Sequence, residues 1–168
     1  MSIWRVSLMA VDEYGLIPLF KDLKPDQREA LAPLFSTLEC TAGALLFEQG
    51  DLAEYLYLIV RGEVTVRYRP EDGPDIVVAH VKPGGVVGWS AALGNRQYTS
   101  GAICTKQSQL LRVRGDNLRD LCIRYPDTGK IVLERLATVI DERLRCTHEE
   151  VINLLKQGMA NQENPLQT

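Results

Sequence analysis

The sequence lacks the marks of several classes of protein. No apolar run approaches the roughly 20 residues of a membrane-spanning helix, and the N-terminal segment MSIWRVSLMAVDEYG has no basic region followed by a signal-peptide core. Walker, GxSxG and HExxH motifs are missing, and the two histidines, His80 and His148, lie far apart in the sequence. We therefore expect a cytoplasmic protein without enzymatic activity, bound metal or membrane attachment.

Paired cysteines and an excess of basic charge are also missing. The four cysteines form no CxxC pair and no ligand cluster in the sequence, so we interpret them as free thiols: Cys40, Cys104, Cys122 and Cys146. Lys and Arg number 19 against 22 Asp and Glu, which gives a net charge of -3. Such a chain has no general attraction to nucleic acid or to anionic membranes.

The 168 residues that are present suffice for one domain with a substantial core. Helical spacing covers residues 12–38 and returns over residues 116–157, and the polar residues 159–168 are expected to be disordered. Between them, residues 39–115 contain short apolar runs separated by Gly and Pro turns, and Val64, Val66 and Tyr68 alternate with polar residues. This predicts an α+β, mainly β domain over residues 1–158: an antiparallel jelly-roll barrel of about eight strands with N-terminal helices and a long C-terminal helix.

The C-terminal helix is the longest predicted element. Pro126 suits its first turn, and the apolar rhythm continues from about Asp127 to Lys156, ending near Gly158. At about 1.5 Å per residue this helix spans roughly 45 Å, more than a small barrel can cover. One face carries an apolar stripe: Leu133, Leu136, Ile140, Leu144, Thr147, Val151 and Leu154. We expect part of the stripe to pair with a second copy in a homodimer; the alternative is a helix lying wholly on its own domain.

The order of these elements resembles the cyclic-nucleotide-binding domain of the catabolite activator protein family, over about Ile17 to Leu155. Four strings carry the resemblance, in the family's order and at nearly its spacing: GALLFEQGD, YLYLIVRGEVTV, KPGGVVGWSAAL and RYPDTGKIVLERLA. The string RLRCTHEEVINL, residues 143–154, is similar to the family's dimer helix. The resemblance implies a homodimeric regulatory module that binds a cyclic nucleotide such as cAMP in its jelly roll.

The same resemblance implies a phosphate-binding cassette with two altered positions. Gly88 matches the glycine that opens the cassette, but Trp89 stands where the family has a glutamate that binds the ribose 2′-OH. Thr99 and Ser100 match the small residues after the phosphate-binding arginine, and Tyr98 occupies the position of that arginine. The exchange matters because a charge-assisted hydrogen bond to phosphate is roughly twice as strong as a neutral one.

Several interpretations of the cassette remain open. Arg96 would replace the arginine if the cassette loop were shorter by two residues; the alternative is a solvated loop charge. Trp89 either plugs the pocket or offers a flat face to a base or sugar. The short helix through Ser90 and Ala91 would direct backbone N–H groups towards an anion.

At the base end of the pocket, Thr147 matches a threonine that contacts adenine in the family, and His148 replaces the adjoining serine from the partner subunit. Thr147 has the alternative role of an ordinary residue in the dimer seam. We expect no cofactor apart from a cyclic nucleotide as ligand. The tail after Gly158 is short and lacks a basic cluster, so direct DNA binding is not expected. The function is then a ligand-sensing regulatory module; the alternatives are a dimerisation scaffold without nucleotide binding and a sensor of another small anion.

Overall fold

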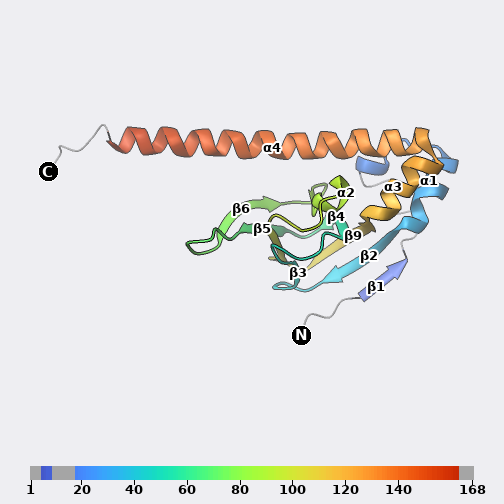
Figure 1. Ribbon diagram of the computed structural model, residues 1–168, viewed down its shortest axis with the longest axis horizontal. Helices are drawn as coiled ribbons and strands as arrows, with labels where there is room; N and C mark the ends of the chain where they lie inside the picture. The colour runs from blue at the N-terminus through green and yellow to red at the C-terminus, as the bar shows by residue number, and fades with distance from the viewer. Residues whose placement is uncertain (1–4, 9–17, 163–168) are drawn as a thin grey trace.

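Two antiparallel β-sheets carry a group of helices at one end and a long helix along one side (Figure 1). The computed structural model describes the backbone of residues 5–8 and 18–162, and the side chains of residues 19–142, 152, 153, 155 and 156. The elements, in chain order, are β1 (Arg5–Leu8), the 3-10 helix η2 (Pro18–Phe20), α1 (Pro25–Leu31), the 3-10 helix η3 (Ala32–Leu34), β2 (Phe35–Cys40), β3 (Leu45–Phe47), β4 (Tyr55–Arg61), β5 (Val64–Tyr68), β6 (Ile76–Val81), β7 (Val86–Val87), α2 (Ser90–Leu93), β8 (Gly101–Cys104), β9 (Ser108–Arg114), α3 (Gly115–Arg124) and α4 (Pro126–Gln162).

The strands form a five-stranded sheet in the order β1-β2-β9-β4-β7 and a four-stranded sheet in the order β3-β8-β5-β6. Every strand pair among them is antiparallel. The predicted mainly β architecture with accompanying helices is therefore confirmed. Closure of the strands into a jelly-roll barrel stays a prediction.

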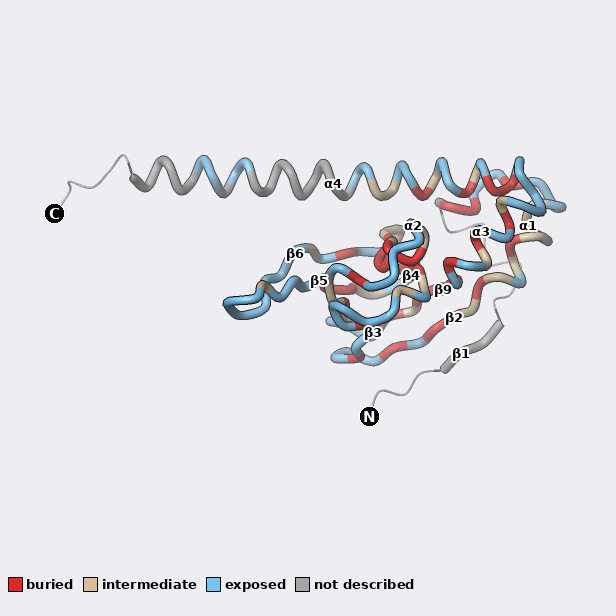
Figure 2. Tube along the Cα trace, viewed as in Figure 1, coloured by how far each residue is buried: buried red, intermediate tan, exposed pale blue. Residues whose placement is uncertain are grey.

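Two apolar clusters form the core. Figure 2 shows where buried residues lie along the strands, on α3 and on the first part of α4. The first, which we call the helical cluster, joins the helices to one face of the five-stranded sheet and includes Phe20, Leu31, Phe35, Leu58, Leu118, Leu121, Val132 and Leu136. The second, the sheet cluster, lies between the two sheets and includes Leu38, Cys40, Phe47, Tyr57, Val64, Val66, Tyr98, Cys104 and Leu110. The cassette lies between the two clusters, because Tyr98 belongs to one and Trp89 packs against the other.

The N-terminal helical region is shorter than the spacing predicts. Phe35 opens strand β2 instead of continuing the helix, because Pro33 lacks an amide donor and α1 ends at Leu31. Strand β1, which the sequence analysis did not predict, pairs with β2 in the register Val6↔Leu38. Residues 12–17 of the predicted helical region lie outside the described residues.

Helix α4 contains 37 residues and continues through Gly158 to Gln162. A single glycine inside an exposed helix costs only about 1 kcal/mol relative to alanine, which is too little to end it. Residues 163–168 of the expected disordered tail lie outside the described residues. The first part of α4 packs on the domain through Val132 and Leu136, and the remainder extends past the sheets (Figure 1). Among the described residues, no helix is long and apolar enough to cross a membrane.

Candidate functional site

The cassette begins at Gly88, directly after β7. Gly88 has a left-handed backbone with φ of +78°, and a Cβ there would lie 2.7 Å from the carbonyl oxygen of Tyr55 and 3.3 Å from the Tyr98 ring. A side chain at this position would therefore be strained and would also collide with strand β4. Glycine allows the chain to turn here while β4 and Tyr98 approach closely.

Tyr98 points into the sheet cluster and is only 5% exposed. Its ring stacks on that of Phe47, with centroids 3.8 Å apart and planes inclined by 18°. Its hydroxyl donates a hydrogen bond to the carbonyl oxygen of Tyr55 at 2.6 Å and accepts one from the amide of Tyr55 at 3.0 Å. Burial raises the pKa of Tyr98, so the phenol is neutral at physiological pH. Both functions of this hydroxyl are thus used by the protein's own backbone.

Little space remains beside Tyr98. The cavity at the cassette has a volume of about 10 Å³ and is lined by Phe47, Val66, Val87, Gly88, Trp89, Ser90, Tyr98, Thr99 and Ser100. This volume is about the minimum for one water molecule, whereas small-molecule sites usually offer roughly 300–1,000 Å³. In this conformation, the stacked rings of Tyr98 and Phe47 fill the interior of the cassette.

Trp89 occupies the N-cap position of α2, and no side-chain hydrogen bond caps this helix. The indole is half-buried and packs against the helical cluster, while the residue also lines the small cavity. The following residues, Ser90 and Ala91, are 3% and 1% exposed. Trp89 therefore connects the cassette to the core under the helices.

Arg96 lies away from the cavity. Its side chain is exposed, and its carbonyl oxygen accepts a hydrogen bond from the amide of Ala53. The next residues are held by an isolated bridge between Gln97 and Leu52 and by the bond from the Tyr98 amide to the Asp51 carbonyl. In this segment Tyr98 is buried, whereas Arg96 is exposed and does not line the cavity.

The remaining predicted site residues divide into two groups. Six of them line the small cavity: Gly88, Trp89, Ser90, Tyr98, Thr99 and Ser100. Ala91 is buried but does not line this cavity. Thr147 and His148 belong to α4, but their side chains lie outside those described, so their contact with a ligand stays a prediction.

Two residues of the site escaped the sequence analysis: Phe47, which stacks on Tyr98, and Tyr55, whose backbone binds the Tyr98 hydroxyl. The aromatic ring of Tyr55 contacts the guanidinium group of Arg112, whose Cζ lies 4.4 Å from the ring centroid. Phe47 falls within a string that carries the family resemblance, but nothing in that string indicates a contact with the cassette.

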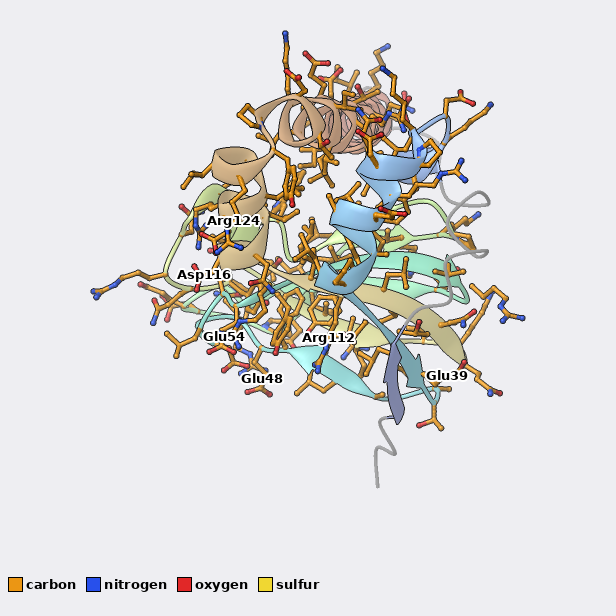
Figure 3. The ribbon with its side chains drawn as sticks, turned by 90° about the vertical axis from the view of Figure 1, so that its right-hand side faces the viewer. Glu39, Glu48, Glu54, Arg112, Asp116 and Arg124 are labelled. Atoms are coloured by element: carbon orange, nitrogen blue, oxygen red, sulfur yellow. The ribbon has the colours of Figure 1, made fainter. Side chains whose placement is uncertain are left out.

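The cassette is also joined to the helices. Arg119 of α3 donates a hydrogen bond to the carbonyl oxygen of Ala91 at 3.1 Å, which satisfies one of the orphan carbonyls at the end of α2. Gly115 packs so closely that a Cβ there would lie 2.2 Å from that same oxygen. The amide of Gly115 donates to the carbonyl of Glu54 at 3.0 Å, and Figure 3 shows Glu54 and Asp116 at this junction of β4 and α3. Helix α3 in turn shares the helical cluster with α4.

A larger cavity of about 460 Å³ lies elsewhere, between β3, β8 and the β5–β6 hairpin. The Arg69–Asp75 ion pair lies at this cavity, and Arg69 holds the pKa of Asp75 below its ordinary value through their hydrogen bond. The cavity is lined by Leu45, Phe47, Glu48, Gln49, Arg67, Arg69, Pro70, Glu71, Asp75, Gly101, Ala102 and Ile103, and so contains none of the predicted site residues. Within the described part of the chain, no three His, Cys, Asp or Glu side chains gather as a metal site.

Comparison with known proteins places this geometry in a family. The family model described as "Cyclic nucleotide-binding domain" matches residues 37–125. This range includes the whole cassette and all strands except β1 and the first two residues of β2. The "cAMP-activated global transcriptional regulator CRP" of Salmonella typhimurium is 30% identical over 65% of this chain and 50% of its own. The "Cyclic AMP receptor protein" of Thermus thermophilus is 27% identical over 76% of this chain and 57% of its own. The chain thus spans about half the length of these curated relatives.

A solved structure shows the same fold over nearly the full chain. It is a cyclic nucleotide-binding domain from Methylobacillus flagellatus, 19% identical, with a TM-score of 0.80 over 89% of this chain and 88% of its own. The family-model match covers more than half of the present sequence. The chain belongs to the cyclic nucleotide-binding domain family.

Proposed function

We propose that the chain is a homodimeric regulatory module in which the state of the cassette is transmitted through α3 to α4. The observation that carries this proposal is the direct contact between α2 and α3: Arg119 binds the carbonyl oxygen of Ala91, and Gly115 packs against the same oxygen. A movement of the cassette helix therefore displaces the start of α3. Because α3 and α4 share one apolar cluster, the displacement reaches the first turns of α4.

The length and exposure of α4 support a second copy of this chain as its partner. Ile152 and Leu155 are exposed in the C-terminal half of the helix, and Leu133 is exposed nearer its start. The β5–β6 hairpin points in the same direction as this half of the helix (Figure 1) and exposes further apolar side chains: Tyr68, Ile76, Val77 and Val78. A second α4 alongside the first would cover apolar surface that a monomer leaves in water.

The ligand step is a rearrangement of Tyr98. The two curated relatives are named for cAMP, and a cyclic nucleotide or another small phosphate is the ligand class that we propose here. Such a ligand cannot enter a cavity of about 10 Å³, so binding requires Tyr98 to leave Phe47 and to release Tyr55. The ligand would then select an open state of the cassette over the closed one.

A second candidate is a dimerisation scaffold that works without a ligand. The Tyr98 hydroxyl hydrogen-bonds both the amide and the carbonyl of Tyr55, so the closed cassette leaves no unsatisfied polar group at that position. This arrangement favours the scaffold. In this case Tyr98 replaces the ligand as a permanent part of the core.

Thermal unfolding with a panel of cyclic mononucleotides, cyclic dinucleotides and inorganic phosphate distinguishes the two candidates. A specific ligand at 100-fold its dissociation constant adds about 2.7 kcal/mol to stability, and hydrogen exchange of α4 should change with it. Absence of any shift across the panel would support the scaffold. A monomeric mass at micromolar concentration would contradict the homodimer in either case.

A further inference from the structure

The larger cavity, of about 460 Å³, lies against the four-stranded sheet beside the β5–β6 hairpin. Val66 and Ala102 belong to the sheet cluster, so Arg67 and Ile103, the next residues along β5 and β8, lie on the opposite face of the sheet. Arg67 pairs across the strands with Gly101, which has no side chain to fill the space beside it. The volume of the cavity is within the roughly 300–1,000 Å³ that small-molecule sites usually offer.

Two sets of polar contacts hold the walls of this cavity in place. The Gln49 side chain donates a hydrogen bond to the carbonyl oxygen of Arg69 at 3.1 Å and accepts one from its amide at 2.8 Å, which ties the segment after β3 to the hairpin. The Arg69 guanidinium forms an ion pair with Asp75 across the hairpin, with Nε 2.7 Å from Oδ1. The cavity is therefore pre-formed by contacts within the chain, as is usual for a small-molecule site.

Part of the cavity lining is apolar. Leu45 and Ile103 are cross-strand partners that both line the cavity, and Leu45 remains 43% exposed. A ligand with an apolar body would cover this side chain and remove apolar surface from water. Phe47 lines both this cavity and the small one at the cassette, so such a ligand would lie next to the stack of Phe47 on Tyr98.

The cavity also holds charged groups of both signs that are free to bind a ligand. Among the residues that the structure describes, no hydrogen bond or ion pair engages the Arg67 guanidinium or the side-chain carboxylates of Glu48 and Glu71. All three side chains line the cavity and are exposed, so no burial hinders access to them. A guanidinium binds a carboxylate through two parallel hydrogen bonds, and a carboxylate accepts hydrogen bonds from an ammonium group. These free groups suit a ligand that carries both charges.

From this lining we propose that the larger cavity binds a small zwitterion with an apolar body, namely an apolar α-amino acid. Its carboxylate binds Arg67, its ammonium group binds Glu48 or Glu71, and its side chain covers Leu45. A cyclic nucleotide fits this lining poorly, because it brings a negative phosphate and no ammonium group to a cavity where the carboxylates, including that of Asp75, outnumber the two guanidinium groups. The site is thus separate from the cassette and does not depend on what the cassette binds.

The first experiment is isothermal titration calorimetry of the full chain with L-leucine, L-phenylalanine and glycine. We expect at least one of the two apolar amino acids to bind with a dissociation constant of about 1 mM or below, and glycine, which lacks the apolar body, to bind at least tenfold more weakly. The amine 3-methylbutylamine and the acid 4-methylpentanoate each keep the body of leucine with one of its charges, and both should bind at least tenfold more weakly than leucine. Absence of binding by both apolar amino acids would overturn the proposal, and so would equal binding of leucine and either analogue.

Variants then test the place of binding. Arg67→Gln and the double variant Glu48→Gln/Glu71→Gln should each weaken binding of the amino acid at least tenfold, and the fold should be retained because these side chains are exposed. Arg124→Gln, at an exposed arginine of α3 that does not line the cavity, is the matched control and should leave the affinity unchanged. Unchanged affinity in Arg67→Gln would overturn the proposal, as would an equal loss in Arg124→Gln.

Discussion

Tyr98 and Phe47 stack with their ring centroids 3.8 Å apart and leave a cavity of only about 10 Å³ at the cassette. The stack is fixed at its far end, because the Tyr98 hydroxyl bonds both the amide and the carbonyl of Tyr55. Tyr98 is therefore a structural residue in this conformation of the cassette.

Removing the hydroxyl should destabilise the domain while keeping the stack. We expect Tyr98→Phe to lower the free energy of unfolding by about 1–3 kcal/mol, because the amide and carbonyl of Tyr55 lose a partner in a partly buried place. Urea unfolding measures the change. Tyr68→Phe, at an exposed tyrosine, is the matched control and should stay within about 0.5 kcal/mol. Equal stability of Tyr98→Phe and the parent would show that these bonds contribute nothing.

Restoring the family's two polar anchors should favour nucleotide binding. We expect the double variant Trp89→Glu/Tyr98→Arg to be less stable than the parent without ligand, because it places charges in a cavity of about 10 Å³ beside apolar rings. With millimolar cAMP its melting temperature should rise more than that of the parent, since the arginine gains a charge-assisted bond to phosphate. Adenosine, which has no phosphate, is the control ligand. The same rise with both compounds would contradict a phosphate contact.

The sequence predicted the fold because the pattern is local. Alternating apolar residues such as Val64 and Val66, separated by Gly and Pro turns, indicate short antiparallel strands, and the structure has both residues buried in β5. Strand β1 was missed, although Val6 and Leu8 alternate with polar residues, because four residues are too few to distinguish from a loop. Phe35 was misplaced because helix and strand periods overlap over so short a run.

Whether Tyr98 fills the interior of the cassette could not be predicted from local sequence patterns in the same way. The sequence places Tyr98 and Trp89 where the resemblance has polar anchors, but whether a tyrosine binds a ligand or fills its space depends on Phe47 and Tyr55, more than forty positions earlier in the chain. Such contacts follow from packing between distant segments, which residue spacing does not encode.

The contact between Gly115 and Ala91 should be sensitive to one added methyl group. A Cβ at Gly115 would lie 2.2 Å from the Ala91 carbonyl oxygen, so Gly115→Ala must push α3 away from α2. We expect a loss of about 1–3 kcal/mol in urea unfolding, together with faster hydrogen exchange in α2. Gly101→Ala, where the nearest atom would be 3.4 Å away, is the matched control. Indistinguishable effects of the two variants would argue against tight coupling of the cassette to α3.

Alkaline pH should loosen the sheet cluster. Burial raises the pKa of both Tyr98 and Tyr57 in the folded protein. Their contribution to stability is therefore fully present below the unfolded value of about 10 and is lost as the pH rises through the higher folded values. Urea unfolding across this range should show stability falling above about pH 10, less steeply in Tyr98→Phe. Equal slopes in the two proteins would mean that Tyr98 titrates alike in both states.

A charge on the extended part of α4 should separate the proposed dimer without unfolding the domain. Leu155 is 63% exposed in the single chain, and pairing with a second α4 would bury it, so Leu155→Glu would bring a carboxylate into an apolar seam. We expect its dimer dissociation constant to rise at least tenfold, equivalent to about 1.4 kcal/mol, as measured by sedimentation equilibrium. Ile123→Glu carries the same change on α3, where the side chain is 76% exposed, and should leave the mass unchanged. If Ile123→Glu dissociates the dimer and Leu155→Glu does not, the interface lies on the helical end of the domain and α4 has another partner.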